Sequence, residues 1–291
     1  MILIALLLPS IIFLGIVFGF PLLSYLWLSL HANSVLTSFR SIFNGWANWN
    51  RFIHDYRYWQ DFLQTIRFSV ASVGIELLLG LIIALILHRP MKFRGWIRSS
   101  SLIPWALPTT VMALGWRWIF NSPFGPIDQF TTALGAQSLN ILGNPSTAWI
   151  ATVYSDVWKT TPFVALILLA GLQSIPADLY EACRLEGASA SSCFRRITLP
   201  LLMPYIGLAA MFRLAQAFGV FDLIQVMTGG GPASSTESIA LYAYLNALRF
   251  LDFGYGATII IGSFILLSIL VASCWFFVHL FNRKRSIMIT K

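Results

Sequence analysis

Six long apolar runs alternate with shorter polar segments along the chain. The runs span about residues 3–30, 67–87, 99–120, 148–175, 201–227 and 256–281. A helix needs roughly 20 residues to cross a bilayer core of about 30 Å, and each run is long enough. Prolines, which can kink or interrupt such helices, occur in the first and third runs at Pro9, Pro21, Pro104 and Pro108. The pattern predicts an all-α membrane protein in which residues 1–291 form one domain with six transmembrane helices.

The composition excludes a soluble protein. The chain is 57% hydrophobic and 10% charged, whereas roughly 25% of the residues of an ordinary soluble domain are charged. So few charged side chains cannot cover a water-facing surface. A signal peptide would show a basic start and a small-residue cleavage site. Residues 1–30 carry no charge and have neither feature. We therefore expect residues 3–30 to be a retained helix.

The distribution of basic residues predicts the orientation in the membrane. The net charge is +8, and this excess lies in two acid-free clusters that directly follow apolar runs. These clusters are Arg89, Lys92, Arg94 and Arg98, and Arg283, Lys284, Arg285 and Lys291. Lys and Arg are enriched in cytoplasmic loops, so both clusters, both termini and the polar segment 176–200 are expected on the cytoplasmic side. The clusters then serve as membrane anchors, and nucleic acid is excluded as a partner.

The 176–200 segment is a polar, charge-balanced stretch between two apolar runs. Pro176 suits the first turn of a helix, and Asp178 complements the helix dipole there. Gly187 can adopt the left-handed conformation that ends the helix. A second short helix is expected from Ser189 to Ile197, before Pro200 opens the next transmembrane run. The resulting helix-turn-helix is predicted to dock on a soluble partner.

The cysteines indicate neither a disulfide nor a metal site. The three cysteines are Cys183, Cys193 and Cys274, and none forms a Cys-x-x-Cys pair or a cluster with metal-ligand spacing. Cys183 and Cys193 lie in the segment expected in the cytoplasm, so we expect reduced thiols. No catalytic residue, bound metal or cofactor is predicted for this chain.

The spacing within the 176–200 segment resembles that of a known family. The residues Glu181-Ala182-Cys183, then Gly187, then Ile197-Thr198-Leu199-Pro200 resemble the coupling segment of the permease subunits of ABC importers. Cys183 stands where that family usually has alanine, which is also small and often buried. The resemblance implies that the segment contacts an ATPase subunit. The residues implied in this contact are Tyr180, Glu181, Ala182, Cys183, Glu186, Gly187 and Phe194.

Two further stretches narrow the resemblance to the maltose-type carbohydrate permeases. They are residues 221–232 with Ser235-Thr236, and residues 158–163. The resemblance covers roughly residues 60–282 and implies a bacterial inner-membrane subunit in a heterodimer with a second permease. It also implies two ATPase subunits, which bind ATP and Mg²⁺, and an extracytoplasmic sugar-binding protein. The run Gly229–Pro232 is not a phosphate loop, because no Lys-Ser/Thr pair follows it.

Two polar helix faces are the predicted substrate site. Side chains at i, i+3, i+4 and i+7 share one face of a helix, and maltose-type permeases contact sugar at the aligned positions. The predicted substrate-binding residues are Asp156, Lys159, Thr160 and Phe163, then Arg213, Gln216, Ala217 and Val220, with Asp222 towards the outer end. Asp156–Lys159 and Asp222–Arg213 could instead be structural ion pairs. Glu76 is expected to pair with a base on another helix, which the sequence does not identify.

The balance of intramembrane charge favours a neutral substrate. Glu76, Asp156, Lys159 and Arg213 sum to zero, whereas a phosphate group would require surplus positive charge. A neutral sugar, disaccharide or small glycoside is therefore the expected substrate. A glycerol-phosphate or phosphodiester importer is the alternative. No His-Glu-x-x-His or Gly-x-Ser-x-Gly motif is present, so the chain is predicted to be a transport subunit and not an enzyme.

Overall fold

The computed structural model describes residues 2–289 and divides the chain into two compact units. Unit 1 combines Met1–Trp59 with Tyr242–Lys291, and unit 2 is Gln60–Leu241. Lys291, one of the four bases counted after the last predicted helix, lies outside the described residues.

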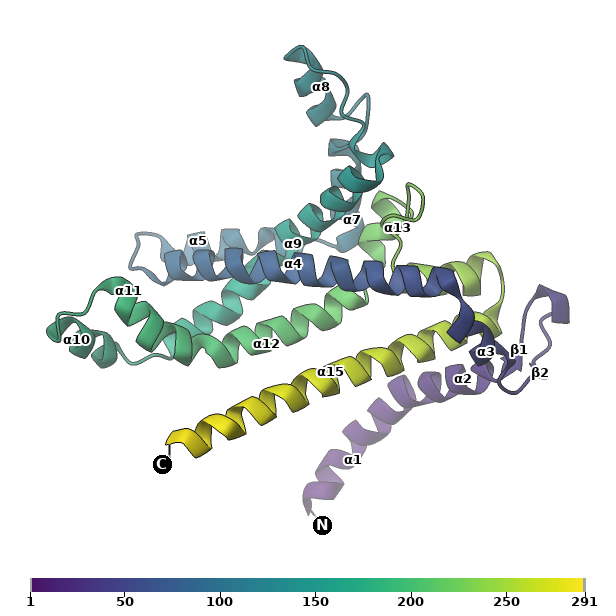
Figure 1. The fold of residues 1–291 in the computed structure, drawn as a ribbon, viewed down its shortest axis with the longest axis horizontal. Coiled ribbons are helices and arrows are strands. Elements are labelled where there is room, and N and C mark those ends of the chain that lie inside the picture. The colour runs from purple at the N-terminus through teal and green to yellow at the C-terminus, as the bar shows by residue number, and fades with distance from the viewer. Residues whose placement is uncertain (1, 290–291) are drawn as a thin grey trace. The chain divides into compact units, whose positions relative to one another are not determined.

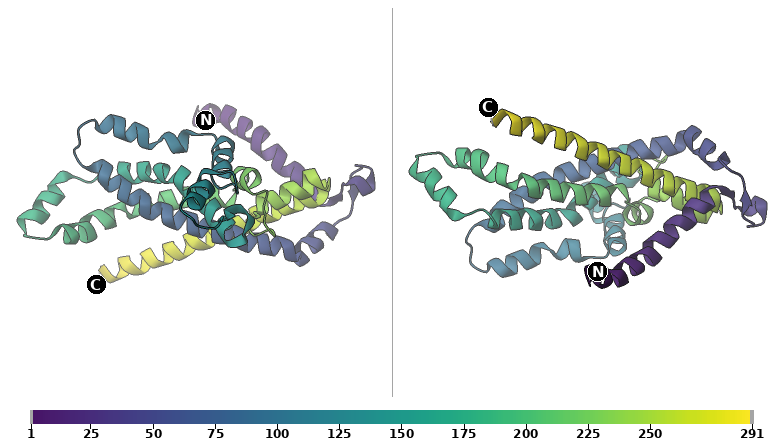
Figure 2. Two further views of the ribbon diagram at one scale, coloured as in Figure 1. Left: turned by 90° about the horizontal axis from the view of Figure 1, so that it is seen from above. Right: turned by 90° about the horizontal axis from the view of Figure 1, so that it is seen from below.

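Unit 1 contains two long helical stretches and a small hairpin. Its elements are α1 (Ile2–Leu14), a π turn (Gly15–Gly19), α2 (Phe20–Ser29), β1 (His31–Ala32), a 3₁₀ turn (Val35–Thr37), β2 (Ile42–Phe43), α3 (Ala47–His54), a second π turn (Leu245–Arg249) and α15 (Phe253–Ile289). The helix α14 (Ile239–Tyr244) ends in this unit. The two short strands pair antiparallel, and α2 lies beside the first part of α15 (Figures 1 and 2).

A half-buried carboxylate joins three elements of unit 1. Asp55 lies between α3 and α4 (Tyr56–His88), and its side chain accepts hydrogen bonds from the backbone N–H groups of Arg57 and Tyr58. The hydroxyl groups of Tyr242 and Tyr255 donate to its other oxygen. Burial raises the pKa of Asp55, but the hydrogen bonds to its charged form outweigh burial. The pKa of Asp55 is therefore below the ordinary aspartate value of 3.8.

Unit 2 is built from long helices that cross at close range. Its elements are most of α4, then α5 (Arg94–Ser101), α6 (Ile103–Ala106), α7 (Thr109–Ile119), α8 (Pro126–Ala133), a 3₁₀ turn (Ile141–Gly143), α9 (Pro145–Gln173), α10 (Ala177–Leu185), α11 (Ala190–Cys193), a π turn (Phe194–Thr198), α12 (Leu199–Phe218) and α13 (Asp222–Met227). A Cβ atom on Gly80 of α4 would lie 2.6 Å from Cγ1 of Val164 on α9. The contact between α4 and α9 therefore requires glycine at this position.

Five helices among residues 2–289 are long and apolar enough to cross a membrane. They are Leu7–Ser29, Tyr56–His88, Pro145–Gln173, Ala190–Phe218 and Phe253–Ala272. The mostly helical fold predicted from the sequence is confirmed, but the count of six spans stays a prediction.

The predicted helix 99–120 is divided into pieces, and the predicted helix 201–227 is shorter than expected. Leu107 is extended, with ψ 137°, because the following proline disfavours the helical conformation. This break separates α6 from α7, and a second break at Leu102 separates α5 from α6. The fifth predicted helix ends at Phe218, and α13 follows as a separate short helix.

The 176–200 segment confirms the first half of the predicted helix-turn-helix and corrects the second. Pro176 precedes α10, and Gly187 ends it with φ +71°. The second helix is not a separate element, because Ala190–Phe218 runs as one helix through the π turn. The wide π turn before Pro200 accommodates the ring and the missing N–H of that residue.

The expectation of reduced thiols in this segment is wrong in the structure. Cys183 at the end of α10 and Cys193 at the end of α11 form a disulfide, with their Cα atoms 6.2 Å apart. The turn at Gly187 folds the chain back on itself and brings the two residues face to face. The prediction considered the cellular compartment and not this local geometry.

Candidate functional site

Three charged side chains from three helices meet inside unit 2. Nε and Nη2 of Arg213 on α12 donate to the two carboxylate oxygens of Glu76 on α4, at 2.6 and 3.0 Å. Nη2 also donates to Oδ2 of Asp156 on α9, at 3.0 Å. All three residues are buried. The guanidinium group of Arg213 therefore ties α4, α9 and α12 together.

Two polar residues complete this charged cluster. The hydroxyl of Thr160 donates to Oε1 of Glu76 at 2.7 Å, and Nη1 of Arg213 donates to Oε1 of Gln216 at 2.9 Å. Thr160 is buried, whereas Gln216 is exposed on the surface of this chain. Each nitrogen of the guanidinium thus has an acceptor, which is the condition for placing a charge in a low-dielectric interior.

Lys159 lies beside the cluster but binds the break in the chain between α6 and α7. Its Nζ donates to the carbonyl oxygens of Leu107 and Trp105, at 2.8 and 3.4 Å. The ring of Phe163 on α9 stacks on the ring of Trp105, with 5.5 Å between centroids. Both contacts attach α6 to α9. Lys159 thereby satisfies carbonyl groups that the interrupted helix leaves without their helical partners.

Five of the predicted substrate residues do not join the charged cluster. Lys159 and Phe163 contact α6, as described above. Ala217 belongs to an apolar cluster, and Val220 packs against it. Asp222 is the first residue of α13, beyond the end of α12, where its charge complements the helix dipole. The structure therefore brings together Asp156, Thr160, Arg213 and Gln216 from the predicted set.

The ion pairs differ from those weighed in the sequence. Arg213 pairs with Glu76 and Asp156 instead of Asp222, and Lys159 donates to carbonyl oxygens. The expected pairing of Glu76 with a base on another helix is confirmed, and that base is Arg213; Glu76 was nevertheless absent from the predicted substrate residues, although it lies at the centre of the cluster. The available signal was an acid in the middle of an apolar run, which marks a buried polar contact.

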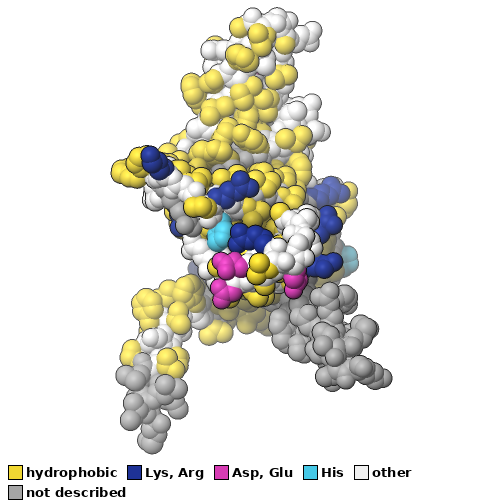
Figure 3. All heavy atoms as spheres, turned by 90° about the vertical axis from the view of Figure 1, so that its left-hand side faces the viewer, with side chains coloured by type: hydrophobic (Ala, Val, Ile, Leu, Met, Phe, Trp, Pro, Cys, Tyr) yellow, Lys and Arg dark blue, Asp and Glu magenta, His cyan; other side chains and the backbone are white. Residues whose placement is uncertain are grey.

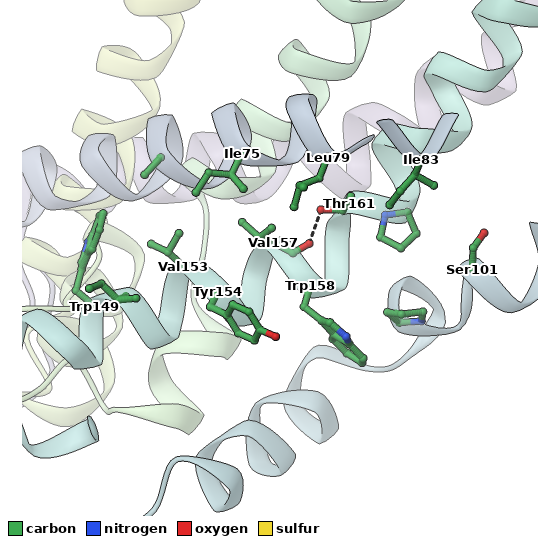
Figure 4. A pocket seen from close by; sticks show the side chains of 14 residues that line it. Ile75, Leu79, Ile83, Ser101, Trp149, Val153, Tyr154, Val157, Trp158 and Thr161 are labelled. Atoms are coloured by element: carbon green, nitrogen blue, oxygen red, sulfur yellow. Dashed lines mark hydrogen bonds between the residues drawn. The ribbon is translucent and has the colours of Figure 1, made fainter. Parts of the chain in front are cut away.

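A separate apolar cavity of about 630 Å³ lies between α4, α6 and α9. Figure 4 shows its walls, with Ile75 and Leu79 from α4 and Val153, Val157 and Trp158 from α9. None of the residues of the charged cluster lines it. The lining of this cavity is mostly apolar, so the cavity suits a hydrocarbon chain and not a polar ligand.

The 176–200 segment presents charged and apolar side chains at one end of unit 2 (Figure 3). Glu181, Ala182 and Glu186 are exposed, and Leu185 has 89% of its surface exposed. Phe194 is half-buried. The hydroxyl groups of Tyr180 and Thr198 are hydrogen-bonded at 3.0 Å, which fixes the base of α10 against the start of α12. The tip of α10 is thus free to contact another molecule.

Residues 76–286 match the family described as binding-protein-dependent transport system inner membrane component. The chain is 43% identical over 246 residues to the trehalose/maltose transport system permease protein MalF of Thermococcus litoralis, covering 84% of this chain and 83% of the relative. It is 35% identical over 261 residues to the sulfoquinovosyl glycerol transport system permease protein SmoG of Agrobacterium fabrum, covering 90% and 85%.

A solved structure has the same fold. The crystal structure of a bacterial ABC transporter involved in the import of the acidic polysaccharide alginate contains a chain that matches with a TM-score of 0.80. The sequence identity is 20%, and the match covers 94% of each chain.

Proposed function

The chain belongs to the family of binding-protein-dependent transport system inner membrane components, and we propose that it carries a neutral sugar, disaccharide or small glycoside into the cytoplasm. It is a transport subunit of an ABC importer and not itself an enzyme. The observation that carries the proposal on substrate is the 43% identity with a trehalose/maltose permease protein over 84% of the chain.

The charged cluster supports a neutral substrate over a phosphorylated one. The guanidinium of Arg213 already binds two carboxylates and one amide. It therefore has no nitrogen left for the bidentate contact that a phosphate group favours. A glycerol-phosphate or phosphodiester substrate would have to displace Glu76 or Asp156 from a buried ion pair.

We assign the substrate path to the helix faces around this cluster. Gln216 is exposed, and Lys159, which lies beside the cluster, is half-buried, so these two side chains are the accessible polar groups on the two helix faces. Thr160 and Asp156 lie behind them and hold the polar groups in position. Phe163 continues the face on α9 and Ala217 the face on α12, and Val220 and Asp222, which follow the end of α12, complete the proposed lining.

We assign ATPase contact to the tip of the 176–200 segment. The exposed acids Glu181 and Glu186 flank Leu185, which supplies apolar contact. Tyr180, Ala182, Cys183, Gly187 and Phe194 hold the shape of this tip. The complete importer then contains a second, homologous permease subunit, two ATPase subunits and an extracytoplasmic sugar-binding protein. Both termini of this chain lie in the cytoplasm.

Transport proceeds by alternating access between two states of the subunit. ATP binding closes the ATPase dimer and moves α10, and the movement passes to the membrane helices. The path then opens towards the binding protein, and hydrolysis returns it to the cytoplasmic side. ATP can shift this equilibrium only because the ATPase contacts the two states differently.

The test is ATP hydrolysis by the purified importer in liposomes with its binding protein. A panel contains trehalose, maltose, sucrose and glucosylglycerol on one side and glycerol phosphates on the other. We expect one of the neutral compounds to stimulate hydrolysis. Stimulation by a glycerol phosphate alone would replace the proposed substrate class with the alternative.

A further inference from the structure

The tip of α10 is covalently attached to the helix that follows it. Cys183 and Cys193 form a disulfide, and their side chains are 9% and 7% exposed. We propose that this pair is a reversible dithiol–disulfide site whose oxidised form makes α10 and the helix Ala190–Phe218 move as one body. The inference rests on the proposed contact between α10 and the ATPase.

A side-chain hydrogen bond and the disulfide attach α10 to the helix that follows, at different heights along α10. The hydrogen bond between Tyr180 and Thr198 fixes its base. The disulfide holds the last turn, next to the exposed Leu185. A helix held at one point can pivot, whereas a helix held at two points transmits a push on its tip. Opening the disulfide would leave the base attached and release the tip.

The disulfide also links the tip, through one continuous helix, to the charged cluster. Cys193 lies on the helix Ala190–Phe218, which continues without a loop to Arg213. Arg213 follows Cys193 by 20 positions, which correspond to about 30 Å of helix. Arg213 binds Glu76 and Asp156 on the two neighbouring helices. A displacement of α10 can thus reach three membrane helices through one covalent link and one buried ion cluster.

The chemistry requires a small dithiol or a small disulfide as the exchange partner. A thiolate of the dithiol attacks one cysteine sulfur, the S–S bond breaks, and the leaving thiolate takes up a proton. The second thiol of the dithiol then attacks the mixed disulfide and releases the other cysteine as a thiol. The products are two protein thiols and one cyclic disulfide, and the reverse reaction restores the bond. Because both cysteines are largely buried, small reagents are favoured over proteins.

The first experiment determines the state of the cysteines in the assembled importer. Cells are quenched in acid, free thiols are alkylated, and peptides are mapped without reduction. We expect a linked peptide pair containing Cys183 and Cys193, together with alkylated Cys274. Alkylation of Cys183 and Cys193 in the unreduced sample would overturn the inference.

The second experiment measures sugar uptake per ATP hydrolysed in liposomes equilibrated with reduced or oxidised dithiothreitol. We expect reduction to lower this ratio about threefold and reoxidation to restore it. The double variant Cys183→Ala, Cys193→Ala should show the lower ratio in both conditions. Cys274→Ala is the matched control and should respond like the unchanged chain.

Two results of the second experiment would also contradict the inference, and each is separable from failure of the proposed function. An unchanged ratio after mapping has confirmed reduction would show that the bond does not affect coupling. A redox response that persists in the double variant would place the effect elsewhere. Retention of the ATPase and sugar stimulation are measured first in the oxidised importer, so their absence would indicate failure of the proposed function itself.

Discussion

Replacing Arg213 by methionine should destabilise unit 2 strongly. The substitution leaves the carboxylates of Glu76 and Asp156 buried without the guanidinium group that they share. In the unchanged chain this group lies 2.6 Å from Glu76 and 3.0 Å from Asp156. Breaking a buried ion pair by removing one partner costs about 3–5 kcal/mol. In a chain of this size, we expect the midpoint of thermal unfolding in detergent to fall by about 10 °C.

The matched control removes all three charges together. The triple variant Glu76→Gln, Asp156→Asn, Arg213→Met should recover much of the lost stability, because no uncompensated charge stays buried. Arg213→Lys should be intermediate, since an ammonium group keeps the charge but cannot reproduce the fork of the guanidinium. Both variants are measured in the same detergent and at the same ionic strength.

A methionine variant that unfolds at the temperature of the unchanged chain would contradict this role of Arg213. A triple variant that is less stable than Arg213→Met would contradict it as well. Either result would mean that the guanidinium does not compensate the two buried carboxylates.

Three further substitutions test other parts of the account. Gly80→Ala should destabilise the chain by about 1–3 kcal/mol through overpacking against α9. Gly74→Ala on the same helix, where a Cβ meets nothing within 4 Å, should be neutral or stabilising; equal effects would contradict the close contact. Glu181→Lys should release the ATPase from the purified complex. The control Asp178→Lys changes another exposed acid of α10 and should retain the ATPase. Retention of the ATPase by both variants would argue against the proposed contact. The stability deficit of Asp55→Asn should be present at neutral pH and shrink as the pH falls below 3.8, because the native carboxylate has a lowered pKa. A deficit that does not change with pH in thermal unfolding would contradict this role.

A few local residues were enough to predict the first helix of the 176–200 segment, α10. Gly187 takes a left-handed conformation that side chains disfavour, so the presence of glycine at this position predicted the end of α10. The long apolar runs likewise predicted most of the long helices. These features are local, and the residues that cause them lie within a few positions of their effect.

The sequence did not predict which side chains contact each other across different helices. Glu76 and Arg213 are 137 positions apart, and periodicity gives the face of a helix but not the helix that it meets. The disulfide was missed because the expected compartment was given more weight than the turn that brings Cys183 to Cys193. The division of the third run depended on how Pro108 restricts Leu107, and an apolar count does not register that restriction.

Uptake of a labelled sugar by the complete importer shows whether this chain carries a neutral sugar. The complete importer is placed in liposomes with ATP on the ATPase side and the binding protein on the other, and the sugar that stimulates hydrolysis is added. The account predicts that this neutral sugar accumulates above its external concentration only when ATP and this chain are both present. Accumulation of a glycerol phosphate in its place, or sugar entry that is independent of ATP, would contradict it.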